Sequence, residues 1–395
     1  MVEIDNIKSI VVIGAGMMGH EIAQVALMGG FKTVILNDLT EDILDKASKR
    51  IAKNLGKLNK KGVMDPNYTN PDLIGNLIKE TDLEKAVSHA DFVIEAIPEI
   101  MSLKQDLFKR LGIFSPEHAI LATNTSTMSI TKIASLSGKP DKVIGCHFFT
   151  PIVILRLIEI IRGKKTSDKT VNITKNVCKK FPAVQGKRVL PILQKESPGF
   201  IVNRLMLSTS LYLNWLLEFS IENKIPLEEI DADAEFLTEI GPFAKLDYLG
   251  LDTICNTMNY FTEVLSSEFS PCETITRLVN EGHLGRKTGK GLFEWKQGKP
   301  IISKDKKAGL FNIELFMAIQ LNEGCKLLEE QIVNGYKIID DTVMAGMNLP
   351  GPFGPGKRNY LKWTKLLENF AEESGINYVK PCNLLKTGKF LRMRK

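Results

Sequence analysis

The stretch 9-SIVVIGAGMMGHEIAQVALMGGFKTVILND-38 decides the fold of this chain. An apolar run at 10–13 leads into Gly14-Ala15-Gly16-Met17-Met18-Gly19, which has the pattern G-x-G-x-x-G. Apolar residues then recur at helical spacing as far as the glycine pair at 29–30. A second β-rich run, 33–36, leads to Asp38. The stretch therefore predicts a strand, a glycine turn, a helix, a second strand and an acid, in that order.

Each part of this stretch suits a dinucleotide. Gly14 permits a tight turn, Gly16 lets the backbone approach a pyrophosphate, and Gly19 lets helix and strand pack closely. The helix N-terminus offers free N–H groups and partial positive charge to the phosphates. Asp38 can accept hydrogen bonds from a ribose 2′-hydroxyl and would repel a 2′-phosphate, which favours NAD over NADP. We expect the cofactor to contact Gly14, Ala15, Gly16, Met17, Met18, Gly19 and Asp38.

The composition is that of an ordinary globular protein of two or three domains, with 395 residues, 44% hydrophobic and 25% charged. The net charge of +6 comes from Lys and Arg spread along the chain, so we expect no nucleic-acid partner. No apolar run has the length of a membrane span, and the first strand begins too early for a signal peptide. The six cysteines form no C-x-x-C pair and no ligand cluster. We therefore expect a cytoplasmic protein with reduced thiols, no membrane partner and no metal site.

Strand patterns at 91–95, 121–123, 143–146 and 155–160 alternate with helical patterns, which is typical of an open α/β sheet. Ligands bind such sheets at the carboxyl ends of the strands. From residue 191 onward the pattern is helical, with a polar stretch at 296–307 that is typical of a linker. We therefore predict an NAD-binding Rossmann-type domain at 1–190 and two all-α domains at 191–296 and 308–395.

The two helical segments contain an internal repeat. Near residue 218 the chain has Glu218, then Ile230-Asp231, then Gly241-Pro242-Phe243. Near residue 329 it has Glu329, then Ile339-Asp340, then Gly351-Pro352-Phe353. Three matches in order indicate a duplicated helical domain. Because a linked copy has a high effective concentration, we expect the copies to pack as an intrachain pseudo-dimer. The chain would then be a monomer, or a dimer through another surface.

His147 is the histidine best placed for catalysis, because it follows a strand that has a buried pattern. Oxidation of an alcohol needs a base for the hydroxyl proton, and a histidine suits that role. Glu159, on the next predicted strand, could orient the imidazole, although it could also be an isolated surface acid. A basic helix end at 53–61 could be a solvated surface or a clamp for the phosphates of a substrate carrier.

The chain resembles the L-3-hydroxyacyl-CoA dehydrogenases. The matching motifs are 14–19, 95-EAIPE-99, 124-NTS-126, 147-HFF-149, 157-LIE-159, 197-SPGFIVNR-204, 241-GPF-243 and the loop around Lys287. They cover about 290 residues in the right order. The C-terminal segment resembles the second helical domain of multifunctional β-oxidation proteins, and no enoyl-CoA hydratase region accompanies it.

The resemblance implies a role for individual residues. His147 would be the base with Glu159 as its partner, and Asn203 would shape the acyl site. Ser126 would contact both the substrate and the cofactor. Further NAD contacts would come from Glu99, Lys104, Thr150 and Lys287, and coenzyme A contacts from Asn54 and Lys61. The family usually has Asn where this chain has Thr150, so support for the cofactor or the histidine could differ here.

The activity that the resemblance implies is reversible oxidation of an L-3-hydroxyacyl-CoA to a 3-oxoacyl-CoA with reduction of NAD. The residues also allow a dehydrogenase of a free hydroxy acid or sugar acid on the same scaffold. A third hypothesis, from another class of protein, is a non-catalytic NAD-binding redox sensor. The presence of His147, Glu159 and Ser126 disfavours that third hypothesis.

Overall fold

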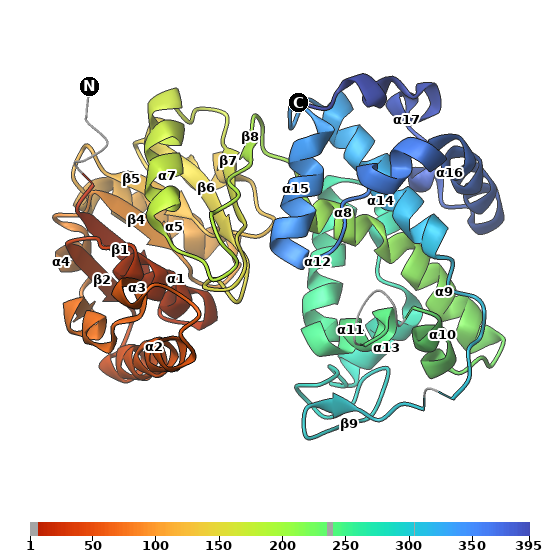
Figure 1. Ribbon diagram of the computed structural model, residues 1–395, viewed down its shortest axis with the longest axis horizontal. Coiled ribbons are helices and arrows are strands. Elements are labelled where there is room, and N and C mark those ends of the chain that lie inside the picture. The colour runs from red at the N-terminus through yellow and green to blue at the C-terminus, as the bar shows by residue number, and fades with distance from the viewer. Residues whose placement is uncertain (1–6, 235–239, 304) are drawn as a thin grey trace. The chain divides into compact units, whose positions relative to one another are not determined.

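The structure is a computed structural model that describes residues 7–234, 240–303 and 305–395 (Figure 1). The chain divides into two compact units. Unit 1 contains residues up to 201 together with 331–333 and 341–348, and unit 2 contains the rest. Unit 1 is a sheet covered by helices, and unit 2 is almost wholly helical (Figure 1). This confirms the predicted fold class, whereas the finer division into helical domains at 191–296 and 308–395 stays a prediction.

Unit 1 is built on an eight-stranded sheet with the strand order β3-β2-β1-β4-β5-β6-β7-β8. Neighbouring strands are parallel from β3 to β6, β7 is antiparallel to β6, and β8 is parallel to β7. The strands are β1 (Ser9–Ile13), β2 (Thr33–Asn37), β3 (Leu77–Glu80), β4 (Phe92–Glu95), β5 (Ile120–Thr123), β6 (Val143–Phe148), β7 (Ile158–Arg162) and β8 (Ile192–Leu193). The short edge strands β3 and β8 were not predicted, and β7 begins three residues later than expected.

Both faces of this sheet are buried, as is usual for a parallel sheet with crossover helices. Alternate strand residues such as Ile10 and Val12 share one core with helices α1, α2 and α7. The intervening residues, such as Val11 and Val93, are also fully buried. The helices of unit 1 are α1 (Met17–Met28), α2 (Glu41–Lys61), α3 (Pro66–Thr69), α4 (Leu83–Val87), α5 (Met101–Phe114), α6 (Ile130–Ala134) and α7 (Asp168–Lys180).

Unit 2 consists mainly of helices, and a two-stranded ribbon lies in the segment that was expected to be a linker. The ribbon is formed by β9 (Trp295–Lys296) and β10 (Lys299–Pro300). The last residues of α15 are grouped with unit 1. The helices are α8 (Val202–Ser208), α9 (Ser210–Glu222), α10 (Leu227–Asp233), α11 (Pro242–Leu249), α12 (Leu251–Val264), α13 (Glu273–Asn280), α14 (Ile313–Glu329), α15 (Tyr336–Met347), α16 (Phe353–Ser374) and α17 (Asn383–Thr387).

The repeat seen in the sequence is matched by repeated contacts in unit 2. Asp231 accepts a hydrogen bond from the backbone N–H of Phe243 at 2.8 Å, and Asp340 accepts one from that of Phe353 at 3.0 Å. In both copies an aspartate of one helix therefore holds the Gly-Pro-Phe turn that opens the next.

A second contact repeats farther along the chain. Glu218 accepts a hydrogen bond from the backbone N–H of Thr274, and Glu329 accepts one from that of Leu384. Each acceptor lies in the first long helix of its copy, and each donor lies in the first turn of a short helix. The shared pattern supports duplication of one helical unit.

The two copies contact each other within unit 2, through α8 and α14. Arg204 on α8 donates to Glu323 at 2.7 Å, and its guanidinium donates two further hydrogen bonds to the two carboxylate oxygens of Glu330. Arg204 and Glu323 are 2% and 1% exposed. Tyr212 packs its ring against Phe311, with centroids 5.8 Å apart. An ion pair and an aromatic cluster thus join the copies, and the oligomeric state of the chain stays a prediction.

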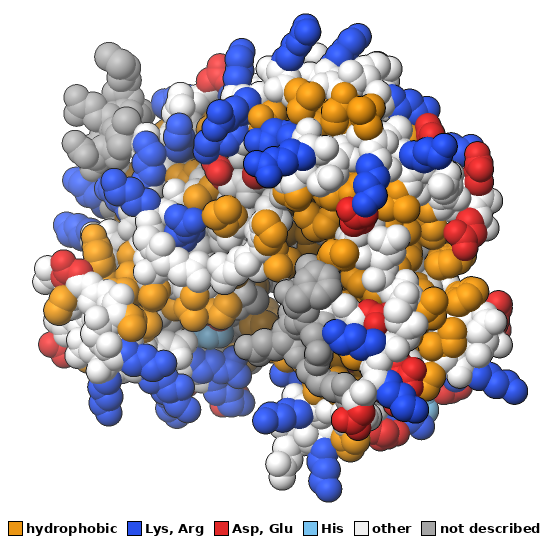
Figure 2. Space-filling view, turned by 45° about the vertical axis from the view of Figure 1, so that its right-hand side comes forward, with side chains coloured by type: hydrophobic (Ala, Val, Ile, Leu, Met, Phe, Trp, Pro, Cys, Tyr) orange, Lys and Arg blue, Asp and Glu red, His pale blue; other side chains and the backbone are white. Residues whose placement is uncertain are grey.

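On the face shown in Figure 2, Lys and Arg side chains are scattered among acidic and hydrophobic ones. Within the described residues, no helix combines the length and the apolar character that crossing a membrane requires.

Candidate active site

The glycine turn between β1 and α1 leaves room for a pyrophosphate. A Cβ on Gly16 would meet nothing within 4 Å, whereas one on Gly14 would lie 2.7 Å from the carbonyl oxygen of Ala96 and one on Gly19 would overlap that of Gly14. Gly14 also has a φ of +96°, which favours glycine. No side chain caps α1, and its first turn contains no acid. The free N–H groups at this helix end therefore suit the phosphates of NAD.

Asp38 lies beside this turn, as predicted from the sequence. One carboxylate oxygen accepts a hydrogen bond from the backbone N–H of Ala15 at 2.6 Å, and the other accepts one from that of Leu39. The turn is further fixed by Gly14, whose N–H donates to the carbonyl of Asn37 at 2.8 Å. Asp38, which would accept a hydrogen bond from a ribose hydroxyl, is thus hydrogen-bonded directly to the loop that would hold the phosphates.

His147 and Glu159 stand directly opposite each other on the antiparallel strands β6 and β7. The Nδ1 atom of His147 lies 2.7 Å from a carboxylate oxygen of Glu159. His147 is 4% exposed and Glu159 is fully buried. The other carboxylate oxygen of Glu159 accepts a hydrogen bond from the backbone N–H of Ile201 at 3.1 Å. The proximity expected from the sequence is therefore confirmed.

This pairing decides the chemical character of the other imidazole nitrogen. An ionised carboxylate can only accept, so we assign the proton of the neutral imidazole to Nδ1. Within the described residues, Nε2 of His147 makes no hydrogen bond. The ring contacts those of Phe149 and Phe200, with centroids 4.4 and 5.5 Å away. Nε2 therefore has the free lone pair that a general base needs.

A second polar cluster lies where β4 and β5 end. Glu99 accepts a hydrogen bond from the backbone N–H of Ser126 at 2.9 Å. Nζ of Lys104 lies 3.2 Å from Glu99 and 2.6 Å from Glu95, which also accepts from the hydroxyl of Thr123. Lys104 is 1% exposed and Glu95 is fully buried. Lys104, predicted to contact the cofactor, thus holds two carboxylates behind the loop that presents Ser126.

Glu95, Asn124 and Glu21 have roles that were not predicted from the sequence. The side-chain oxygen of Asn124 accepts from the backbone N–H of Phe148 at 2.9 Å, so it fixes the strand beside His147. Glu21 accepts from Thr150. Glu95 is the last residue of the apolar strand β4 and Asn124 directly follows the apolar strand β5, and that position could have marked them. Nothing in the sequence near Glu21 points to its partner, which is 129 residues away.

The residues predicted to bind coenzyme A lie on α2 in unit 1. Asn54 donates its amide N–H to Gln24 at 3.3 Å. Lys61 is exposed at the last position of the helix, next to Lys60. Asn203 and Lys287 belong to unit 2, where Lys287 forms an ion pair with Asp252. The structure therefore gathers most predicted site residues in unit 1 and leaves these two in unit 2.

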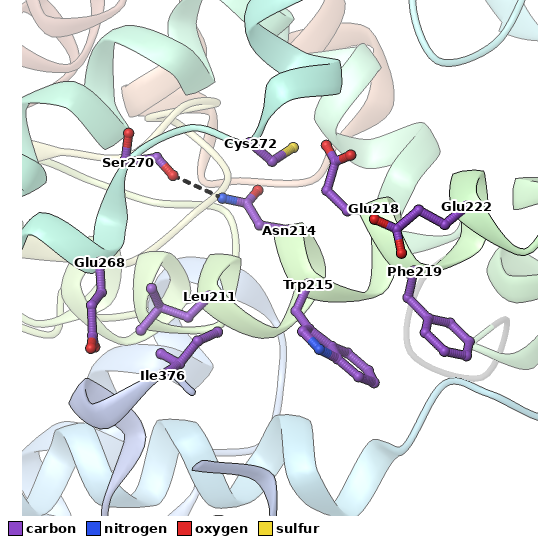
Figure 3. A pocket seen from close by; sticks show the side chains of 10 residues that line it. All are labelled: Leu211, Asn214, Trp215, Glu218, Phe219, Glu222, Glu268, Ser270, Cys272 and Ile376. Carbon is purple, nitrogen blue, oxygen red and sulfur yellow. Dashed lines mark hydrogen bonds between the residues drawn. The ribbon is translucent and has the colours of Figure 1, made fainter. Parts of the chain in front are cut away.

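Unit 2 has a hollow of about 360 Å³, shown in Figure 3. Among its walls, Asn214 donates to the carbonyl oxygen of Ser270 at 3.3 Å. Its lining residues are Leu211, Asn214, Trp215, Glu218, Phe219, Glu222, Glu268, Ser270, Cys272 and Ile376. Because none of them belongs to the predicted site, the hollow does not account for the chemistry inferred above.

Known proteins are similar to this chain in both sequence and fold. The family model for the 3-hydroxyacyl-CoA dehydrogenase NAD binding domain matches residues 9–192, and the model for the C-terminal domain of the same family matches 199–295. A mitochondrial hydroxyacyl-coenzyme A dehydrogenase of Rattus norvegicus is 37% identical over 298 residues, which cover 73% of this chain and 92% of the relative. A probable 3-hydroxybutyryl-CoA dehydrogenase of Deinococcus radiodurans is 36% identical, covering 72% of this chain and 99% of the relative.

A crystal structure extends the similarity in fold to almost the whole chain. The 3-hydroxybutyryl-CoA dehydrogenase of Escherichia coli K12 superposes with a TM-score of 0.83 at 24% identity, covering 98% of this chain and 99% of that one. The second helical segment, from residue 308 onward, is thus part of a known fold. From the two family models and relatives that match nearly over their full length, the chain belongs to the 3-hydroxyacyl-CoA dehydrogenase family and is an NAD-dependent oxidoreductase.

Proposed function

We propose that the chain oxidises an L-3-hydroxyacyl-CoA to a 3-oxoacyl-CoA, with His147 as the general base. The observation that carries this proposal is the buried pair of His147 and Glu159, which leaves Nε2 available for a proton. Bound NAD would supply the hydride acceptor. The test is NADH formation from 3-hydroxybutyryl-CoA, compared with free 3-hydroxybutyrate. A preference for the free acid would support the alternative of a hydroxy-acid dehydrogenase instead.

In the proposed mechanism, Nε2 of His147 accepts the proton of the substrate hydroxyl as the C–H bond at the same carbon breaks. Glu159 accepts a hydrogen bond from Nδ1 throughout and stabilises the imidazolium that forms. The burial of both side chains strengthens that interaction, because nearby water would screen it. Ser126 would hold the substrate oxygen, on a loop that Glu99 fixes through its backbone N–H. Asn203 would help to shape the acyl site.

The position of Asp38 predicts a strong preference for NAD. A 2′-phosphate near this carboxylate would face like-charge repulsion of several kcal/mol, so kcat/KM with NAD should exceed that with NADP on the order of a hundredfold. Steady-state rates with each cofactor measure the ratio. Asp38→Ser, which removes the charge and keeps a short polar side chain, should narrow it. A wild-type preference for NADP would refute the role of Asp38.

The proposed role of Lys61 predicts that its removal changes KM for one substrate and not for another. If its ammonium contacts the nucleotide phosphates of coenzyme A, Lys61→Ala should raise KM for an acyl-CoA by about three- to tenfold. A pantetheine thioester of the same acyl group lacks those phosphates, so its KM should not change. Lys46→Ala is the matched control, because Lys46 is also an exposed lysine of α2 but pairs with Asp42. Equal effects on both thioesters would assign Lys61 a structural role.

A further inference from the structure

Glu21 links two parts of the NAD site that lie far apart in the sequence. It lies in the second turn of α1, the helix that starts at the glycine turn. Its carboxylate oxygens lie 3.1 and 3.2 Å from the hydroxyl oxygen of Thr150. One of them also accepts the backbone N–H of Ile152 at 2.7 Å. Glu21 thus holds the segment that follows β6, the strand of His147, against α1.

These contacts determine how the hydroxyl of Thr150 is oriented. An ionised carboxylate has no proton to donate, so the hydroxyl hydrogen of Thr150 must point toward Glu21. The hydroxyl therefore has no hydrogen left for another partner, and toward a ligand it can only act as an acceptor. Thr150 is exposed and lies three residues after His147. It therefore offers a fixed hydrogen-bond acceptor on the segment that directly follows the β6 strand of His147.

We propose that Glu21 is a positioning residue of the NAD site, acting through Thr150 and the backbone at Ile152. It orients Thr150 as an acceptor for a ribose hydroxyl or a carboxamide N–H of the cofactor, which are both donors. By its bond to the backbone N–H of Ile152, Glu21 also fixes the segment that follows β6 in position relative to the glycine turn. This inference rests on the proposed assignment of Thr150 to the cofactor site.

The negative charge of Glu21 is unfavourable for a residue of this helix. A carboxylate near the pyrophosphate end of α1 repels phosphates, so charge alone would not favour a glutamate at this position. Its value lies in accepting two hydrogen bonds from one segment. Glutamine keeps an acceptor oxygen on a side chain of the same length and removes the charge. Glu21→Gln should therefore preserve the function that Glu21→Ala removes.

The experiment measures NADH binding by fluorescence titration without acyl-CoA, together with the melting temperature. Loss of this hydrogen-bonded link should raise the Kd for NADH about tenfold in Glu21→Ala and in Thr150→Val. Glu21→Gln and Thr150→Ser should stay within about threefold of the wild type, because each keeps the required group. Glu84→Ala is the matched control, since Glu84 is an exposed glutamate of the same unit. Its Kd should equal that of the wild type.

The double variant Glu21→Ala/Thr150→Val tests whether the two residues act together. If Glu21 acts through Thr150, the double variant binds NADH no more weakly than Glu21→Ala alone. Wild-type affinity in Glu21→Ala, or effects that multiply in the double variant, would overturn the proposal. Should Glu21→Ala fail to fold, the Kd for NADH of Thr150→Val is compared with that of Thr150→Ser, because both variants keep the hydrogen bond from Glu21 to the backbone of Ile152. Equal values for the two would then overturn the proposal. A wild type that binds NADH but oxidises no acyl-CoA would instead refute the proposed function alone.

Discussion

Replacing His147 with glutamine is expected to lower kcat by a factor of about 10² to 10⁴, because the substrate hydroxyl loses its general base. Glutamine has a similar reach but its amide cannot take up the proton. The Kd for NADH should stay close to the wild-type value, since His147 lies on β6 and the phosphate-binding turn lies between β1 and α1. Stopped-flow or steady-state NADH formation, with NADH binding measured in parallel, separates the two quantities.

His118→Gln provides the matched control for this experiment. His118 is an exposed histidine of the same unit, and its Nε2 lies 2.9 Å from Asp91. Its replacement should leave kcat unchanged. Glu159→Gln should lower kcat by less than His147→Gln, because the base survives but its imidazolium loses a partner charge. Near-normal turnover by His147→Gln would show that another group takes the proton.

Replacing Arg204 with alanine is expected to destabilise unit 2 by about 3 kcal/mol, because the buried Glu323 would lose one of its two cationic partners and keep only Lys326. All three tryptophans, Trp215, Trp295 and Trp363, lie in unit 2. Tryptophan fluorescence during urea unfolding therefore reports on this unit. Arg277→Ala is the control, since Arg277 and Glu281 form an exposed pair one helical turn apart and should contribute less than about 1 kcal/mol.

The same pair predicts a pH dependence. Burial alone would raise the pKa of Glu323, but Lys326 and Arg204 outweigh it and hold that pKa below its ordinary value of 4.5. A lowered pKa in the folded state contributes stability above pH 4.5 and loses it as pH falls through the folded value. Unit 2 should thus weaken below pH 4.5, and Arg204→Ala should show a shallower loss. The variant Arg204→Met/Glu323→Met, which removes both charges, should recover most of the stability. A stability of Arg204→Ala equal to the wild type would contradict this account.

The parts of the site that were predictable lie close together in sequence or follow a local rule. The glycine turn and Asp38 belong to one strand-helix-strand unit, whose geometry is the same wherever that unit occurs. His147 and Glu159 lie on strands joined by a short connection, so their contact followed from local pairing alone. The resemblance to a known family added roles for residues such as Asn203, which no local rule suggested.

The other contacts depend on tertiary packing that no single stretch encodes. Glu21 and Thr150 meet across 129 residues, and Arg204 and Glu323 meet across 119. Strand β3 has only four residues and contains Lys79 and Glu80, so its sequence shows too little apolar pattern to be recognised. Lys104 is fully enclosed although lysine usually is exposed, because Glu95 and Glu99 compensate its charge. Burial of this kind follows from the assembled fold and not from the residue type.

The pairing of β6 with β7 has a consequence for how this site can vary among related chains. Because His147 and Glu159 are cross-strand neighbours, the connection between them can lengthen or shorten without disturbing their contact, provided that the strands keep their alignment. A slip of one residue, however, would turn the glutamate to the opposite face of the sheet. The number of residues that separate the base from its acid is therefore free to drift, and what selection must preserve is the strand alignment that places His147 directly opposite Glu159.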